Sequence, residues 1–182
     1  IVAFGEWLVG FGSFGAFLYG VFNRLLIPTG LHHALNAVFW FDTAGINDIG
    51  KFQTGVDAVK GITGRYQAGF FPIMMFGIPA AALAMYHSAE TKQQKQVWGW
   101  FLASAISAFV VGVTEPIEFA FMFVAPVLFI IHALLTGLSL LIASLFHWTA
   151  GFSFSAGLID YVLSLINPIA NHPLMLLVQG IV

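Results

Sequence analysis

The chain has 182 residues, of which 59% are hydrophobic and only 8% are charged, and its mean hydropathy is +0.92. A soluble domain carries about 25% charged residues, so this composition excludes an ordinary soluble protein and indicates an integral membrane protein. The net charge of −2 gives no sign of a nucleic-acid partner, and a sequence without cysteine has neither disulfides nor thiolate metal ligands.

Long apolar stretches predict an all-α integral membrane protein built from transmembrane helices. A spanning helix needs about 20 apolar residues, and several of the stretches are shorter or are interrupted by glycine and proline. The second and fourth stretches are expected to be re-entrant or broken, which a membrane tolerates only where protein or water surrounds the backbone. In chain order the stretches are 1–22, 25–41, 67–89, 97–113, 119–147 and 154–182.

Two polar segments, 42–67 and 88–96, flank the third apolar stretch. If this stretch is a single span, the two polar segments lie at opposite ends of it. Pro72, Gly77 and Pro79 interrupt the stretch and predict a kinked helix rather than a straight one.

Residues 112–119 (GVTEPIEF) place two carboxylates between apolar stretches. An ionisable side chain at membrane depth is costly, so it is interpreted as functional. Pro116 suits the first position of a helix, which makes Glu115 the N-cap, a position that glutamate fills poorly. We therefore expect the Glu115 side chain to bind a ligand. Glu118, at the third helical position, is expected to be structural and to reach back to the N-cap amide.

Residues 23–36 surround a second break, at a proline and a glycine. Arg24 adjoins an apolar run and needs a partner, and a guanidinium suits carboxylates, phosphates and sugar hydroxyls. His32 and His33 point about 100° apart on a helix, so at most one is expected to face a given site. Asn36 can share the face of His32. Alternatively, one histidine satisfies a backbone carbonyl at the break. No metal site is expected, because no carboxylate accompanies the histidines at ligand spacing.

A third polar feature lies in residues 151–161, whose many small side chains allow close helix packing. Asp160 in this segment is either an intramembrane acid or a capping or pairing residue, and the sequence leaves both readings open. The remaining histidines are interpreted as interface or core residues rather than ligands. They are His87, His132, His147 and His172.

Together, residues 23–33, 112–119 and 153–161 resemble the membrane-embedded enzyme IIC of the bacterial phosphotransferase system, glucose superfamily. Residues 70–77 and 153–157 are similar to those of its N-acetylglucosamine permeases. The resemblance implies transmembrane helices with two re-entrant helical hairpins in a multi-pass protein of the bacterial inner membrane. It also implies that residues 1–182 are a fragment of one membrane domain. The fragment would be the sugar-transport half, without the N-terminal half that usually forms the dimer interface and without a IIB domain.

The resemblance further implies that N-acetylglucosamine binds between the hairpins and crosses the membrane. On the cytosolic side, a phosphocysteine of enzyme IIB then converts the sugar to its 6-phosphate. Phosphorylated IIB, the lipid bilayer and a second copy are then the expected partners, and no cofactor is expected. By motif, Arg24 and His32 match sugar-site positions of the first hairpin, and Glu115 matches the sugar-contacting glutamate of the second. Glu115 or His32 is the candidate base for the 6-hydroxyl, and Asn36 is a further candidate for sugar binding.

Three other functions remain. The nearest is a glucose or maltose permease of the same superfamily. A proton-coupled secondary transporter is another, because Glu115, His32 and Asp160 are residue types that form intramembrane proton relays. A membrane scaffold without transport activity is disfavoured, since a scaffold has no need for two polar breaks. A nearby soluble domain with a phosphorylatable cysteine would separate the permease from the secondary transporter.

Overall fold

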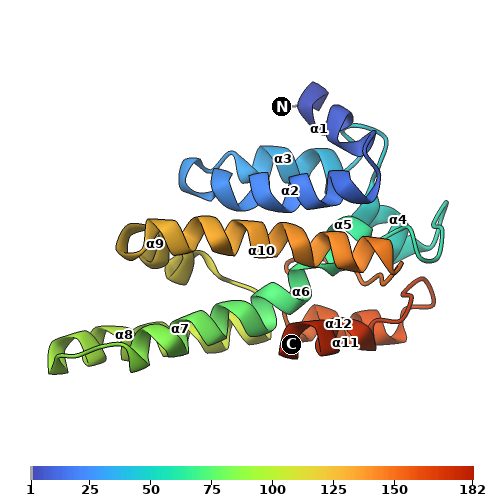
Figure 1. Ribbon diagram of the computed structural model, residues 1–182. Coiled ribbons are helices and arrows are strands. Elements are labelled where there is room, and N and C mark those ends of the chain that lie inside the picture. The colour runs from blue at the N-terminus through green and yellow to red at the C-terminus, as the bar shows by residue number, and fades with distance from the viewer. Residues whose placement is uncertain (1) are drawn as a thin grey trace.

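The computed structural model describes residues 2–182, and this part of the chain is helical (Figure 1). Its β-structure is one isolated bridge, between Thr149 and Asn171. The expectation of an all-α protein is therefore confirmed. The helices are α1 (Val2–Val9), α2 (Ser13–Leu26), α3 (His32–Trp40), α4 (Asp48–Thr54), α5 (Arg65–Ala68), α6 (Phe70–Pro72), α7 (Ile78–His87), α8 (Lys92–Val111), α9 (Glu115–Val124), α10 (Pro126–Leu145), α11 (Leu158–Ile166) and α12 (Leu174–Ile181).

The predicted break in the second apolar stretch is present between α2 and α3. A 3₁₀ turn at Ile27–Thr29 follows α2, and Gly30 then adopts a left-handed conformation with φ of 71°. Pro28 cannot donate a backbone hydrogen bond, and glycine enters the left-handed region without steric cost. The chain therefore reverses, and α3 packs beside α2 (Figure 1). The reversal brings the end of α2, with Arg24, close to the start of α3, with His32.

The third apolar stretch forms one irregular helix, as its prolines and glycine predict. Residues Arg65–His87 run as a single 23-residue helical segment, comprising α5, α6, a π-helical turn at Ile73–Gly77 and α7. A π turn is a local widening of the helix, and it is a known cause of helix kinks. The two polar segments lie at opposite ends of this helix, as expected, with α4 at one end and the α7–α8 turn at the other (Figure 1).

The expected break in residues 97–113 lies at the very end of this stretch. Helix α8 runs without interruption for 20 residues, from Lys92 to Val111, and packs along α7. A capping box starts it: the Thr91 side chain accepts from the Gln94 amide, and the Gln94 side chain accepts from the Thr91 amide. Both orphan groups at the helix start are thereby satisfied. The break comes immediately after α8, where Gly112 has φ of 81°.

The fifth apolar stretch is two helices rather than one. Helix α9 ends at Val124 and α10 begins at Pro126. Proline removes a backbone donor and its ring clashes with the preceding helical turn, so α9 cannot continue through Pro126. The apolar composition does not change across this proline, so composition alone does not separate the two helices. The last apolar stretch is also divided, into α11 and α12.

Helix α10 runs across the middle of the molecule and packs along α2 (Figure 1). The two backbones come close at a pair of glycines, where a Cβ on Gly20 would lie 2.9 Å from the Gly137 Cα. Side chains on the buried face of α10 are small or polar, apart from a phenylalanine and a leucine. They are Phe129, His132, Ala133, Thr136, Gly137, Ser139, Leu140, Ala143 and Ser144.

The exposed face of α10 carries large apolar side chains, which is the reverse of a helix that faces water. They are Val127, Leu128, Ile130, Ile131, Leu134, Leu135, Leu138 and Leu145. Within residues 2–182, two helical segments are long and apolar enough to cross a membrane: Arg65–His87 and Pro126–Leu145.

An aromatic cluster joins α2, α3, α5 and α6 beneath the polar breaks. The Tyr19 ring lies 4.2 Å from the Phe39 ring and 5.8 Å from the Phe70 ring, centroid to centroid, and all three side chains are buried. Aromatic pairs at these separations add to the free energy of burial. The cluster gives the first break a rigid apolar base, and Phe70 forms part of the cavity described next.

Candidate sugar-binding site

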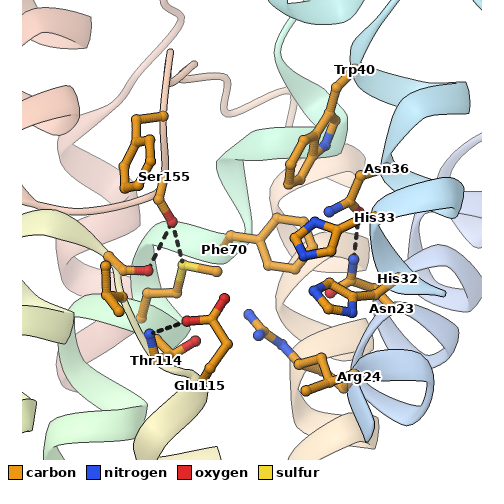
Figure 2. Close-up of a pocket in the computed structure, with 15 residues that line it drawn as sticks. Asn23, Arg24, His32, His33, Asn36, Trp40, Phe70, Thr114, Glu115 and Ser155 are labelled. Atoms are coloured by element: carbon orange, nitrogen blue, oxygen red, sulfur yellow. Dashed lines mark hydrogen bonds between the residues drawn. The ribbon is translucent and has the colours of Figure 1, made fainter. Parts of the chain in front are cut away.

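A cavity of about 190 Å³ lies where the two polar breaks meet (Figure 2). Its wall includes all four residues that the sequence indicates for ligand binding: Arg24, His32, Asn36 and Glu115. The other lining residues are Asn23, Ile27, His33, Trp40, Phe70, Met74, Gly112, Val113, Thr114, Phe154 and Ser155. Side chains from α2 and α3 thus face side chains from the segment before α9 and from residues 154–155.

Arg24 is 2% exposed, and among residues 2–182 only one of its guanidinium nitrogens has a partner. Nη1 donates to Glu118 Oε1 at 2.7 Å, and the guanidinium carbon lies 5.1 Å from the centre of the Phe70 ring. Nε and Nη2 are buried and make no hydrogen bond within the described part of the chain. Buried donors without acceptors are rare and costly, so these two nitrogens call for an oxygen supplied by a ligand or by water.

Glu118 is the fixed partner of Arg24. Its side chain is fully buried, and Oε1 also accepts a hydrogen bond from His132 Nε2 at 3.1 Å. Oε2 accepts from the Thr114 hydroxyl at 3.2 Å. Glu118 thereby joins α2, α9 and α10. The sequence interpreted His132 as a core histidine and did not foresee this contact.

The predicted cap of α9 is wrong by one residue. The helix begins at Glu115 with Thr114 at the N-cap, so Glu118 lies one position later than expected and does not reach the N-cap amide. The Thr114 N–H instead donates to Glu115 Oε2 at 3.1 Å. Proline is tolerated anywhere in the first turn, because those backbone N–H groups have no helical acceptor, and Pro116 therefore did not fix the first helical residue.

Glu115 is half-buried and faces Arg24 across the cavity (Figure 2). Its contact with the Thr114 amide is its one hydrogen bond within residues 2–182, so Oε1 remains an available acceptor. No ion pair joins Glu115 to Arg24 in the described chain. The carboxylate is therefore placed to accept from a ligand.

His32 and His33 both line the cavity, so the expectation that only one faces the site is wrong. Their ring centroids are 3.9 Å apart. The cavity extends around the first turn of α3, and an angle of about 100° between neighbouring side chains does not separate them there. His32 is buried and its Nδ1 has no partner among residues 2–182, whereas His33 is exposed.

Asn36 shares the cavity with His32, as expected, but its oxygen is already in use. Asn36 Oδ1 accepts from the Tyr19 hydroxyl at 2.8 Å and from Asn23 Nδ2 at 2.5 Å. A ligand could therefore use only the amide donors of Asn36. Asn23 was not singled out as a site residue, although it lies in the same motif.

Phe154 and Ser155 supply a further part of the cavity wall. Ser155 Oγ lies 2.8 Å from the Gly112 carbonyl oxygen and 3.5 Å from the Met74 sulfur. A Cβ on Gly112 would lie 2.7 Å from Ser155 Oγ, so this close approach requires glycine. Asp160 lies outside the cavity wall, and its Oδ1 accepts from the backbone amide of Ser153 at 2.9 Å, which favours a structural role in holding the loop before α11.

A series of buried hydrogen bonds, from Asp48 through Gln67 to Phe152, fixes the backbone just before Phe154 and Ser155. Asp48 accepts from the Gly64 amide at 2.8 Å and from Gln67 Nε2 at 3.1 Å. Gln67 Oε1 accepts in turn from the Phe152 amide at 2.8 Å. Burial raises the pKa of the Asp48 carboxyl from 3.8 to about 6. The sequence reading counted Asp48 only as a member of a polar segment, since nothing in its neighbours predicts burial.

Comparison with known proteins decides the family. The sequence model of the family described as "Phosphotransferase system, EIIC" matches residues 1–137. The chain belongs to the phosphotransferase system EIIC family. An EIIC relative in Bacillus subtilis (strain 168), the "PTS system N-acetylglucosamine-specific EIICB component", is 52% identical over 181 residues, covering 100% of this chain and 40% of that protein.

Two further EIIC relatives differ in their printed specificity. The N-acetylglucosamine-specific EIIC component of Streptomyces coelicolor is 48% identical, covering 98% of this chain and 44% of that protein. The glucose-specific EIICBA component of Staphylococcus carnosus is 45% identical, covering 91% of this chain and 26% of that protein. The chain thus spans less than half the length of these relatives.

Proposed function

We propose that this chain is the sugar-binding part of a permease of the phosphotransferase system. In this proposal the permease binds N-acetylglucosamine and carries it across the bacterial inner membrane. Phosphorylated IIB then converts the sugar to its 6-phosphate. The observation that carries the proposal is the cavity where unpartnered nitrogens of Arg24 and His32 lie together with the free oxygen of Glu115.

A sugar matches this set of groups because each hydroxyl both donates and accepts. Arg24 Nε and Nη2 and the Asn36 amide would donate to sugar oxygens, and Glu115 Oε1 would accept from a hydroxyl. Hydrogen bonds to charged groups are the stronger kind, so Arg24 and Glu115 should supply most of the polar affinity. Glu115 or His32 would take the proton of the 6-hydroxyl as it attacks the phosphoryl group.

The sugar assignment rests on the relatives and on the wall of the cavity. Relatives named as N-acetylglucosamine-specific share 48% and 52% identity with the chain, and the glucose-specific one shares 45%. Met74 and Phe154 give the cavity apolar surface against which an acetyl methyl group can pack. A methyl-sized group is worth only about 1–3 kcal/mol of discrimination in such a pocket, so weak glucose binding is expected as well.

The membrane placement and the partners belong to the same proposal. The apolar outer face of α10 would contact lipid, and the α2–α3 reversal and the break at residues 112–114 would form the two re-entrant hairpins. The names EIICB and EIICBA of two relatives support a IIB partner. We assign residues 1–182 to the sugar-transport half of one membrane domain, and dimer formation to an N-terminal half outside this sequence.

Binding of labelled N-acetylglucosamine to the full-length membrane protein tests the proposal. Glu115→Gln removes the charge but keeps the size, and we expect the dissociation constant to rise about tenfold or more, because a hydrogen bond to a charged group is lost. Glu90→Gln is the matched control, since Glu90 is exposed in the α7–α8 turn. Unchanged binding in Glu115→Gln would contradict the assignment. Uptake that delivers unphosphorylated sugar would favour a proton-coupled transporter instead.

A further inference from the structure

We propose that Glu118 is a positioning residue for this site. Its carboxylate, which His132 shares, holds Arg24 away from Glu115 and so keeps Glu115 available to the sugar. The inference rests on the proposed function, because it concerns the same cavity, and it adds a role for two residues that do not line that cavity.

The starting observation is that, within the described chain, Arg24 pairs with one of two nearby carboxylates, that of Glu118, and not with that of Glu115. Figure 2 shows the Arg24 guanidinium and the Glu115 carboxylate pointing into the same space from opposite walls. Arg24 nevertheless pairs with Glu118, at 2.7 Å, and among residues 2–182 it forms no ion pair with Glu115. Both charged groups on the cavity wall therefore keep unused hydrogen-bonding capacity.

This choice matters because opposite charges attract strongly where little water screens them. A direct pair between Arg24 and Glu115 would use the same atoms that a sugar needs and would close the space between the two walls. A sugar would then have to break an ion pair before it could bind. Glu118 prevents this by satisfying the charge of Arg24 from the side.

Glu118 is itself held so that it cannot change partners. Its side chain is fully buried and receives three donors: Arg24 Nη1, His132 Nε2 and the Thr114 hydroxyl. These donors come from α2, from α10 and from the N-cap of α9. With the carboxylate fixed on both oxygens, the direction of Arg24 Nη1 is fixed as well. The remaining nitrogens, Nε and Nη2, are the ones left without partners.

The substitution Glu118→Gln isolates the role of the charge. Glutamine has the same shape and can still accept from Arg24, but the nearest negative charge on the cavity is then that of Glu115. We expect Arg24 to turn toward Glu115 and the dissociation constant for N-acetylglucosamine to rise about tenfold or more, the effect of misplacing one charged hydrogen bond. Glu118→Asp, which keeps the charge on a shorter side chain, should recover part of the affinity.

The measurement is made on the full-length protein, with two readouts: the dissociation constant per folded molecule and the melting temperature without sugar. Ser144→Ala is the control for a purely structural effect. Ser144 donates to Ser13 Oγ at 2.9 Å and so also links α10 to α2, but it lies outside the cavity wall. This control should lower the melting temperature and leave the dissociation constant unchanged.

If Glu118→Gln does not fold, His132 decides the question. His132→Gln keeps an N–H donor for Glu118, whereas His132→Leu removes it, so only the leucine variant should weaken sugar binding. A folded Glu118→Gln or His132→Leu protein with wild-type affinity would overturn the inference. If Glu115→Gln loses binding while Glu118→Gln keeps it, only the positioning role fails. If both variants bind normally, the proposed sugar site fails too.

Discussion

The buried carboxylate of Asp48 makes the stability of the protein depend on pH. Asp48 lies at the start of α4 and is 4% exposed, and burial raises its pKa from 3.8 to about 6. The folded chain therefore binds this proton more tightly than the unfolded chain does. The resulting stability is complete below pH 3.8 and is lost as the pH rises through about 6. Asp48→Asn removes the ionisation while keeping the size of the side chain.

The size of the effect follows from the two pKa values. A difference of about 2 pH units, at about 1.36 kcal/mol for each, corresponds to about 3 kcal/mol over the whole titration. Only part of this range is accessible to experiment. Between about pH 7.5 and about pH 5 the wild-type protein should gain roughly 1 kcal/mol relative to Asp48→Asn.

Thermal melting of the full-length protein in detergent provides the assay, with both proteins measured in the same buffers. Other groups titrate equally in both proteins, so the difference in melting temperature reports Asp48 alone. We expect this difference to move in favour of the wild type as the pH falls. A difference that stays constant with pH, or that favours the wild type at high pH, would refute the reasoning. The folded chain would then stabilise the Asp48 carboxylate as well as the unfolded chain does, or better.

Two further predictions concern the cavity wall. His32→Ala should weaken binding of labelled N-acetylglucosamine more than His33→Ala does, because His32 Nδ1 is buried without a partner in the described chain and His33 is exposed; equal losses would show that the histidines support the break rather than the ligand. Gly112→Ala should lower both the melting temperature and the sugar affinity, because its Cβ would lie 2.7 Å from Ser155 Oγ. Gly55→Ala is the control: Gly55 has φ of 73° and no described neighbour within 4 Å, so this variant should show only the backbone strain of about 1–2 kcal/mol.

The positions of the breaks could be predicted from the sequence where proline and glycine occur together. Pro28 and Gly30 end α2, and Gly112 ends α8, as punctuation by these residues implies. Pro126 was overlooked, since it stands alone in a strongly apolar run. The exact start of α9 was also missed, because a proline in the first turn is compatible with more than one N-cap.

The cavity residues were predictable where they are charged or where they are polar and lie beside a break. Arg24 and Glu115 stood out because charge is rare in this sequence, and the structure brings both to one cavity. Contacts between distant segments leave no local signal, and so the pairing of Glu118 with His132 was not foreseen. Ser155 escaped for the same reason: a serine between small residues looks like a packing position until the fold places it against Gly112.

The close contact between Gly20 and Gly137 makes the spacing of α2 and α10 independent of the side chains at the cavity rim. With no side chain between the two backbones, the spacing of α2 and α10 is set by main-chain atoms. The helices that carry Arg24 and His132 therefore keep their distance whatever happens at the cavity rim. Rim positions such as Phe154 can change without moving the charged groups. The lining of the cavity rim can thus vary in one part of the chain while the positions of the charged side chains are kept in another.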